Sequence, residues 1–309
     1  MKLIAAAAAI LLGAAAPSSA ILLREQAWTP RAEARAFLEE PAECLASRES
    51  AVEIGRALFR SPALLGGPAA RAGLSCNACH SGGRRNGRFL LPELTSRAGA
   101  ADVTSEWSSK VRGDGVANPV DIPDLSGVTR RPAFGQSRDP SLEHFLRSVV
   151  VEEFQGEEPS DATMRSLLAY LRALDEGECS SGATAITLSS AAEDVRRAVT
   201  AADDADAGTA RLVLLAAQDA MGRIVERLPA RRFGAERTRL ATLSRELGAI
   251  RTTGDVNAAM DAALPGWRVR FDATLARLAR RERQTYFNER TLGRALVQQL
   301  LNSSSARVE

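Results

Sequence analysis

Histidine, lysine and cysteine are scarce in this 309-residue chain, and the shortage of histidine and cysteine limits the metal sites that the chain can form. The sequence contains two histidines and four cysteines, so a zinc site with about four such ligands would consume most of them. Lys2 and Lys110 are the only lysines, and arginine supplies nearly all of the positive charge. Because 40 basic residues nearly balance 38 acidic ones, the formal charge of +2 predicts neither a nucleic-acid nor a membrane partner.

Long apolar runs are also lacking. The run at residues 4–16 follows Lys2 and leads to the small residues Ser18-Ser19-Ala20, a pattern typical of a secretory signal cleaved after Ala20. This run is too short to span a bilayer comfortably, and no other segment is long and apolar enough. We therefore predict an exported, periplasmic protein without a transmembrane span after removal of the signal.

The chain does contain the pentapeptide Cys76-Asn77-Ala78-Cys79-His80, which has the attachment pattern of a c-type haem. Two thiols form thioethers with the haem vinyl groups, and the following imidazole binds the iron as the proximal ligand. On a helix, positions 76, 79 and 80 share one face. A redox dithiol or half of a zinc site would explain the cysteine pair but not the adjacent histidine. We predict one covalent haem c held by Cys76, Cys79 and His80.

The other two cysteines, Cys44 and Cys179, lie on either side of this motif along the chain. In an oxidising compartment such a spare pair typically forms a disulfide, which would join the two ends of the haem-bearing region. Two free buried thiols are the alternative.

Hydrophobic periodicity predicts an all-α protein. A helix is expected over 50–60, few regular elements over the Gly- and Pro-rich stretch 81–140, and helices again after Ser141 and Ser160. Further helices are expected at 191–200, 210–228, 236–250, 256–263, 267–283 and 291–301. We predict a signal peptide (1–20), a lead-in (21–42), a c-type cytochrome domain (43–180) and a separate helical-bundle domain (187–309).

Segments around the haem motif resemble the bacterial di-haem cytochrome c peroxidase family. The matching segments are Ile54–Phe59 and Leu74-Ser75 before the motif, then Ile122–Val128, Ser141-Leu142-Glu143 and Leu168–Leu174. Together they cover roughly residues 50–175, and the resemblance implies a class I cytochrome c-like haem domain with long irregular loops. The family's enzymes carry two haem motifs, whereas this chain has one. The family's aromatic-x-His-Asp-Gly segment corresponds to Phe134–Asp139, which lacks the histidine, and its distal methionine corresponds to Val149.

The distal iron ligand has few candidates. His144 lies where the family supplies such a ligand, but it is equally a candidate surface histidine. Met164 is an alternative ligand or a core residue of its helix. Met221 and Met260 are expected in the bundle core, which leaves an open iron as a further option.

Three arginines after the motif, Arg84, Arg85 and Arg88, are candidate partners of the haem propionates, because guanidinium forks match carboxylates. The alternative is a solvated basic loop. Trp107 lies in the same irregular stretch, where it either stacks near the haem edge or fills the core.

Two functions follow from these patterns. The first is an exported mono-haem c-type cytochrome that passes single electrons to a periplasmic redox partner, with the helical domain as a docking or assembly module. The second is a peroxidase-like haem enzyme with an open distal iron, and a small-gas sensor would share that coordination. The sequence does not assign an oligomeric state.

Overall fold

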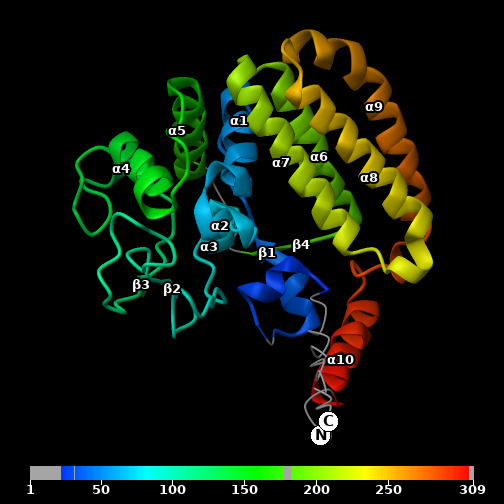
Figure 1. Cartoon of the computed structure of the whole chain (residues 1–309), viewed down its shortest axis with the longest axis horizontal. Coiled ribbons are helices and arrows are strands. Elements are labelled where there is room, and N and C mark those ends of the chain that lie inside the picture. The colour runs from blue at the N-terminus through cyan, green and yellow to red at the C-terminus, as the bar shows by residue number, and fades with distance from the viewer. Residues whose placement is uncertain (1–21, 31, 177–181, 306–309) are drawn as a thin grey trace, which may run out of the picture.

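The computed structural model describes residues 22–30, 32–176 and 182–305 (Figure 1). The predicted signal peptide at 1–20 lies outside these residues, so export stays a prediction. The described chain contains ten α-helices and four short strands, which confirms the all-α class. No described helix combines the length and the apolar content needed to cross a bilayer.

The elements follow the chain in this order. The α-helices are α1 (Ser50–Phe59), α2 (Gly67–Arg71), α3 (Cys76–Cys79), α4 (Leu142–Ser148), α5 (Asp161–Glu176), α6 (Leu188–Asp203), α7 (Ala207–Glu226), α8 (Ala230–Thr252), α9 (Val256–Ala279) and α10 (Glu289–Ser305). The strands are β1 (Glu39–Pro41), β2 (Ala100–Ala101), β3 (Val120–Asp121) and β4 (Ala183–Ala185). Short helical turns are η1 (Arg24–Ala27), η2 (Ala34–Phe37), η3 (Pro62–Leu64), η4 (Ser81–Gly83), η5 (Val128–Arg130), η6 (Val149–Glu153, a π-turn) and η7 (Glu282–Gln284).

Helices α1 and α5 cross at Gly55. A Cβ atom at this position would lie 2.0 Å from the carbonyl oxygen of Ser166, so the helix backbones can approach only because the residue is glycine. One turn later the rings of Phe59 and Tyr170 pack with centroids 5.0 Å apart. Pro62 begins the next turn and prevents α1 from continuing.

The stretch from 81 to 140 contains only η4, η5 and the two-residue strands β2 and β3, as its Gly and Pro content predicts. These loops lie beside α3 and α4, on the side of the molecule away from helices α6 to α9 (Figure 1). They pack around an apolar cluster of their own, described below.

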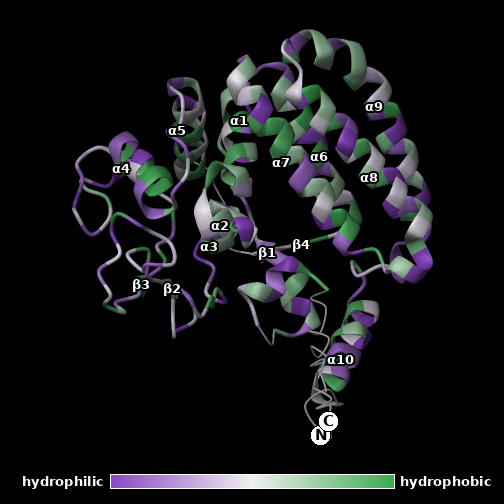
Figure 2. Cartoon of the chain, viewed as in Figure 1, coloured by the Kyte–Doolittle hydropathy of each residue, from purple (hydrophilic) through white to green (hydrophobic). Residues whose placement is uncertain are grey.

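Helices α6 to α9 form the bundle. The predicted break at Pro265 is wrong, because α9 continues through it from Val256 to Ala279. Leu264 and Trp267 on either side are each 1% exposed, and the Trp267 indole donates to the carbonyl oxygen of Leu243 at 2.9 Å. This burial on both sides of the proline offsets the lost backbone hydrogen bond. Figure 2 shows the alternation of hydrophobic and hydrophilic residues along these helices.

The helices of the first half and the bundle share one hydrophobic core. Leu58 of α1 and Leu171 of α5 belong to the same buried cluster as Val195 of α6 and Leu214 of α7. At its edge, β1 pairs antiparallel with β4, which connects the lead-in to the segment between the two halves. The division into separate domains therefore stays a prediction.

A buried ionic network also joins the halves. Glu43 accepts hydrogen bonds from Arg56 Nε at 2.5 Å and from the Tyr170 hydroxyl at 2.8 Å, and Arg56 reaches Asp194 of α6 at 2.6 Å. Burial would raise the pKa of Glu43, but Arg60 and Arg56 hold it well below its usual range. These ion pairs and hydrogen bonds connect α1, α5 and α6 through Glu43.

Candidate functional site

The pentapeptide forms a single helical turn, α3, with His80 as its C-terminal cap, so that the three side chains predicted to hold a haem come from one turn. The backbone N–H of His80 donates to the carbonyl oxygen of Cys76 at 2.9 Å, which closes the turn. Asn77 and Ala78 point to the buried side, and Asn77 Oδ1 accepts from the Gly82 N–H at 2.9 Å. Cys76, Cys79 and His80 are half-buried along the opposite side of the turn.

The His80 imidazole is oriented by Pro123, which lies in the irregular stretch 81–140. Its Nδ1 atom lies 3.0 Å from the carbonyl oxygen of Pro123. A carbonyl only accepts, so Nδ1 carries the proton and Nε2 keeps a free lone pair. Burial lowers the pKa of His80 to about 4, against the opposing effects of the Pro123 hydrogen bond and Asp124. The ring is therefore neutral at neutral pH, which is the form that ligates a metal.

The turn that carries Pro123 is held in place from several sides. The Leu125 N–H donates to the Gly83 carbonyl at 3.0 Å, directly after the motif. Arg131 donates to the carbonyl oxygen of Asp124, and the Asp124 carboxylate accepts from the Ser126 N–H at 2.8 Å. These bonds fix the Pro123 carbonyl and, through it, the direction of the His80 ring.

The two thiols are free, and burial raises the pKa of each to about 12. At neutral pH they are therefore protonated, whereas a redox dithiol depends on a lowered thiol pKa. Among the described residues no group of three or more His, Cys, Asp or Glu side chains could hold a metal ion. The raised thiol pKa accordingly disfavours the redox-dithiol alternative.

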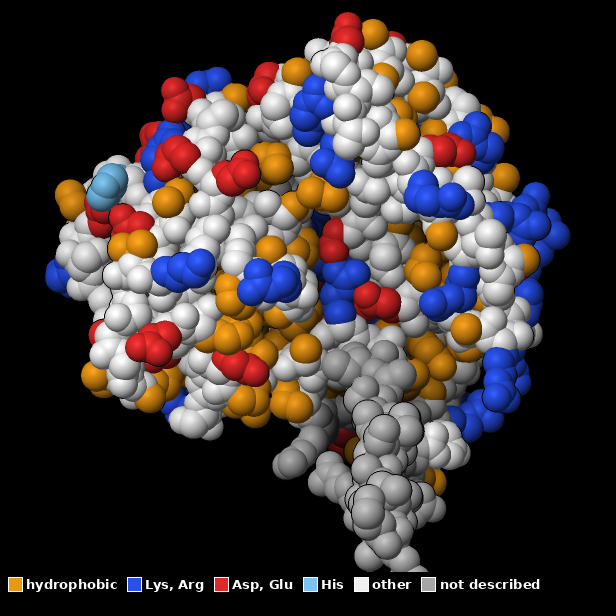
Figure 3. Space-filling model, viewed as in Figure 1, with side chains coloured by type: hydrophobic (Ala, Val, Ile, Leu, Met, Phe, Trp, Pro, Cys, Tyr) orange, Lys and Arg blue, Asp and Glu red, His pale blue; other side chains and the backbone are white. Residues whose placement is uncertain are grey.

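Apolar side chains surround the motif. Cys76 and Cys79 pack against a buried cluster that includes Trp28, Leu74, Phe89, Leu94 and Ile122, with Trp107 and Phe154 partly buried at its edge. Figure 3 shows hydrophobic side chains gathered on the face that carries α2 and α3. Such surroundings fit a large flat apolar cofactor, whose burial would add to this core.

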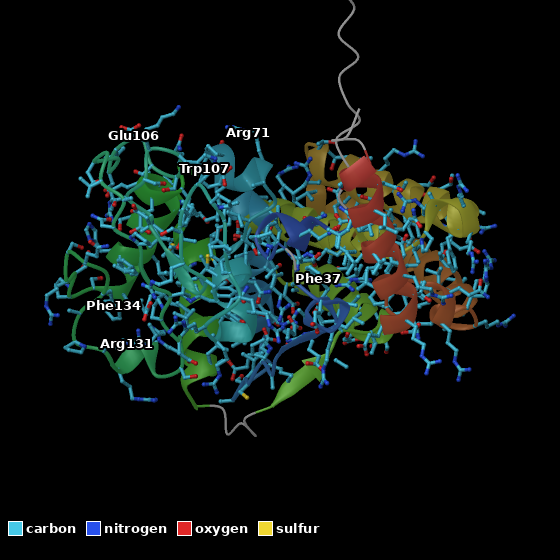
Figure 4. The ribbon with its side chains drawn as sticks, turned by 90° about the horizontal axis from the view of Figure 1, so that it is seen from below. Phe37, Arg71, Glu106, Trp107, Arg131 and Phe134 are labelled. Carbon is cyan, nitrogen blue, oxygen red and sulfur yellow. The ribbon has the colours of Figure 1, made fainter. Side chains whose placement is uncertain are left out.

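The loop region carries several bulky side chains. Figure 4 shows Trp107, Arg131 and Phe134 within it, and Phe37 nearer the helical bundle. Trp107 is half-buried and belongs to the apolar cluster around the cysteines, which favours core filling while leaving it near the motif.

The two distal-ligand candidates lie in different settings. The His144 side chain is 75% exposed and forms an ion pair with Asp139, which favours the alternative of a surface histidine. This hydrogen bond raises the pKa of His144 above its usual value. Met164 is 1% exposed within the core shared by α1 and α5, which favours its packing role.

The three candidate propionate arginines contact protein groups. Arg84 lies 3.4 Å from the Asp124 carboxylate, and Arg85 lies 3.6 Å from that of Asp121. Arg88 donates to the carbonyl oxygen of Ala36 at 3.5 Å. A propionate would have to compete with these partners, so the structure favours the solvated basic loop for this stretch.

The predicted Cys44–Cys179 disulfide involves Cys179, which lies outside the described residues, so it stays a prediction. The neighbouring backbone segments do meet. The Ala42 N–H donates to the Gly182 carbonyl at 3.0 Å, beside the β1–β4 pair. Residues 42 and 182 therefore lie together, on either side of the motif along the chain, as the predicted bridge requires.

Two contributors to the site were not among the predicted residues. The backbone carbonyl of Pro123 accepts a hydrogen bond from His80, and Arg131 donates to the carbonyl of the next residue, Asp124. No sequence signal distinguishes Pro123 from the other prolines of residues 81–140, because every residue carries a backbone carbonyl that could accept from the second ring nitrogen of His80.

Comparisons with models of protein families, with curated proteins and with solved structures give no match to this chain.

Proposed function

We propose that the chain is a mono-haem c-type cytochrome that carries single electrons. One observation carries the proposal: His80 Nδ1 is held on the Pro123 carbonyl at 3.0 Å, while Cys76 and Cys79 present free thiols from the same turn. In this arrangement the Pro123 contact would leave His80 Nε2 able to bind the iron, and the thiols of Cys76 and Cys79 could attach one edge of a porphyrin.

Each residue would have a defined role. The Cys76 and Cys79 sulfurs would each add to a haem vinyl carbon, and the thiol hydrogen would move to the neighbouring carbon, so that no electrons are gained or lost. His80 would ligate the iron through Nε2. When bound, the haem supplies a one-electron Fe(III)/Fe(II) couple. The apolar cluster around the cysteines would exclude water and so help to set its potential.

The finer fold assignment belongs to the same proposal. The crossing of α1 and α5 at Gly55, with Phe59 against Tyr170, supports a class I cytochrome c-like arrangement in residues 43–180. The helical part, 187–309, would be a docking or assembly module. The signal-like N-terminus supports a periplasmic location and a periplasmic redox partner.

An open iron is the second candidate state. His144 is on the surface and Met164 is in the core, so neither setting favours a strong sixth ligand. A peroxidase-like enzyme or a small-gas sensor would need such an open position.

Visible spectroscopy distinguishes these functions. The protein is expressed in a bacterial host that has a c-type haem maturation system and is then examined oxidised, reduced with dithionite, and reduced under carbon monoxide. A covalent haem that is low-spin and does not bind carbon monoxide supports electron transfer. A high-spin haem that binds carbon monoxide at once supports the open-iron functions. Protein that retains no haem after denaturing electrophoresis would overturn both.

A further inference from the structure

The near balance of charge over the whole chain conceals a strong segregation. Residues 229–309 contain 15 arginines and 8 acidic residues, whereas the remaining chain contains 25 basic and 30 acidic residues. The C-terminal helices are therefore basic, while the rest of the protein is acidic overall. Such asymmetry is typical of a surface that binds an anionic partner.

The fold brings part of this charge to one end of the bundle. The beginning of α8 lies beside the end of α9, because Arg281 donates to the Arg232 carbonyl at 3.0 Å and its guanidinium stacks 4.3 Å from the Phe233 ring centre. The Thr291 hydroxyl donates to the Arg283 carbonyl at 2.9 Å, which brings the start of α10 to the same end.

Six exposed arginines gather around this junction, and we call them the arginine patch. They are Arg231, Arg232, Arg277, Arg280, Arg283 and Arg290. None of the six forms an ion pair with any described residue, whereas arginines elsewhere in the bundle do, such as Arg196 with Asp272 at 2.9 Å. Figure 3 shows Lys and Arg side chains following the outer edge of the bundle down to its lower end.

The patch has charge but no apolar anchor. Its large hydrophobic neighbours are inside the protein: Phe233 and Leu278 are 0% exposed and Phe287 is 8% exposed. Stable protein–protein interfaces usually depend on aromatic or aliphatic anchors at their centre. The exposed apolar side chains of α10, Val297, Leu300 and Leu301, lie toward the other end of that helix from Arg290 and not at the centre of the patch. A dense array of phosphates suits it better, because guanidinium groups bind phosphate through paired N–H donors.

We propose that the arginine patch binds the surface of an anionic phospholipid membrane. The protein would associate reversibly by charge, without insertion, and with the start of α8 and the end of α9 facing the headgroups. This inference goes beyond the proposed haem function and holds whether or not a haem is attached. It also replaces the expectation, drawn from the net charge alone, that the chain has no membrane partner.

Vesicle co-sedimentation tests the proposal with the full chain. Vesicles of phosphatidylcholine alone are compared with equal mixtures of phosphatidylcholine and phosphatidylglycerol. We expect binding only to the anionic vesicles, and we expect about 0.5 M salt to release it because exposed charges are then screened. Replacing Arg231, Arg232, Arg280 and Arg283 by Gln should weaken the partition coefficient at least about tenfold.

The matched control removes the same charge elsewhere. Arg48, Arg71, Arg165 and Arg172 are exposed, none forms an ion pair with a described residue, and all four are replaced by Gln. Binding within about threefold of the unmodified protein supports the patch. Equal loss in both variants, binding to neutral vesicles, or salt-matched binding to duplex DNA as tight as to the vesicles would overturn the proposal. Unchanged circular dichroism and melting temperature show that the variants fold.

Discussion

The carbonyl oxygen of Pro123 lies 3.0 Å from the Nδ1 atom of His80, although the two residues are 43 positions apart in the chain. This contact orients the His80 ring within the motif. His80 follows the one-turn helix α3. The Pro123 carbonyl, in the stretch 81–140, accepts from Nδ1 and so leaves the lone pair of Nε2 without a hydrogen on that nitrogen. The haem proposal thus depends on residues from two separate segments.

Removal of the two motif cysteines is the direct test of haem attachment. In the Cys76→Ala/Cys79→Ala variant, haem staining after denaturing electrophoresis should be lost, because no thioether can form. The matched control is Cys44→Ala/Cys179→Ala, which removes the same number of thiols but should keep the stain. Staining retained in the first variant would refute the covalent assignment.

Loosening the Pro123 turn should change the redox potential. Arg131→Lys keeps the positive charge that acts on His80 but removes the guanidinium hydrogen bond to the Asp124 carbonyl, so it weakens the constraint on the His80–Pro123 contact. A less basic imidazole stabilises Fe(III) less, so the midpoint potential should rise by about 20–60 mV, which corresponds to one hydrogen bond. Protein-film voltammetry measures it. Arg97→Gln, which breaks an exposed ion pair with Asp121, is the control and should leave the potential unchanged.

The helix crossing at Gly55 should tolerate no side chain. Gly55→Ala places a Cβ atom against the Ser166 carbonyl, so α1 and α5 must separate, and we expect a loss of about 1–3 kcal/mol in the free energy of unfolding. Gly234 in α8 has no atom within 4 Å of its Cβ position, and Gly234→Ala should instead stabilise by about 0.5–1 kcal/mol. Thermal melts followed by circular dichroism compare the two. Equal effects would show that α1 and α5 do not cross closely.

The His144–Asp139 pair predicts a local pH dependence. The hydrogen bond to Asp139 raises the pKa of His144 above its ordinary value. A raised histidine pKa contributes stability that is fully present below the unfolded-state pKa of about 6.5 and is lost as the pH rises through the folded-state pKa. Titration of the His144 ring protons by NMR should give a midpoint above about 6.5. Asp139→Asn should move it back, and an unshifted midpoint would exclude the pair.

The sequence was sufficient for the parts of this protein that depend on local pattern. The helical class, the motif turn and the irregular stretch after it all follow from spacing and from Gly and Pro content. The helix break predicted at Pro265 was wrong. The helix-breaking effect of this proline is offset by the burial of Leu264 and Trp267, which only the assembled bundle provides. The Pro123 acceptor and the arginine patch could not be predicted from the sequence either, because each arises where segments distant in the chain meet.

A Cys44–Cys179 disulfide would join the two ends of residues 43–180. The hydrogen bond from Ala42 to Gly182 joins segments that lie two and three residues from the two cysteines along the chain. Titration of the denatured, unreduced haem-bearing protein with a thiol reagent should find no free thiol, because the other two cysteines are in thioethers. Cys44→Ala should expose one thiol and lower the free energy of unfolding by up to about 4–5 kcal/mol, the entropic limit for a loop of this length. Two thiols found in the unmodified protein would instead establish the alternative of free cysteines. Glu43 precedes Cys44 and accepts from Arg56 and Tyr170, so loss of the bridge should also loosen this buried ionic network.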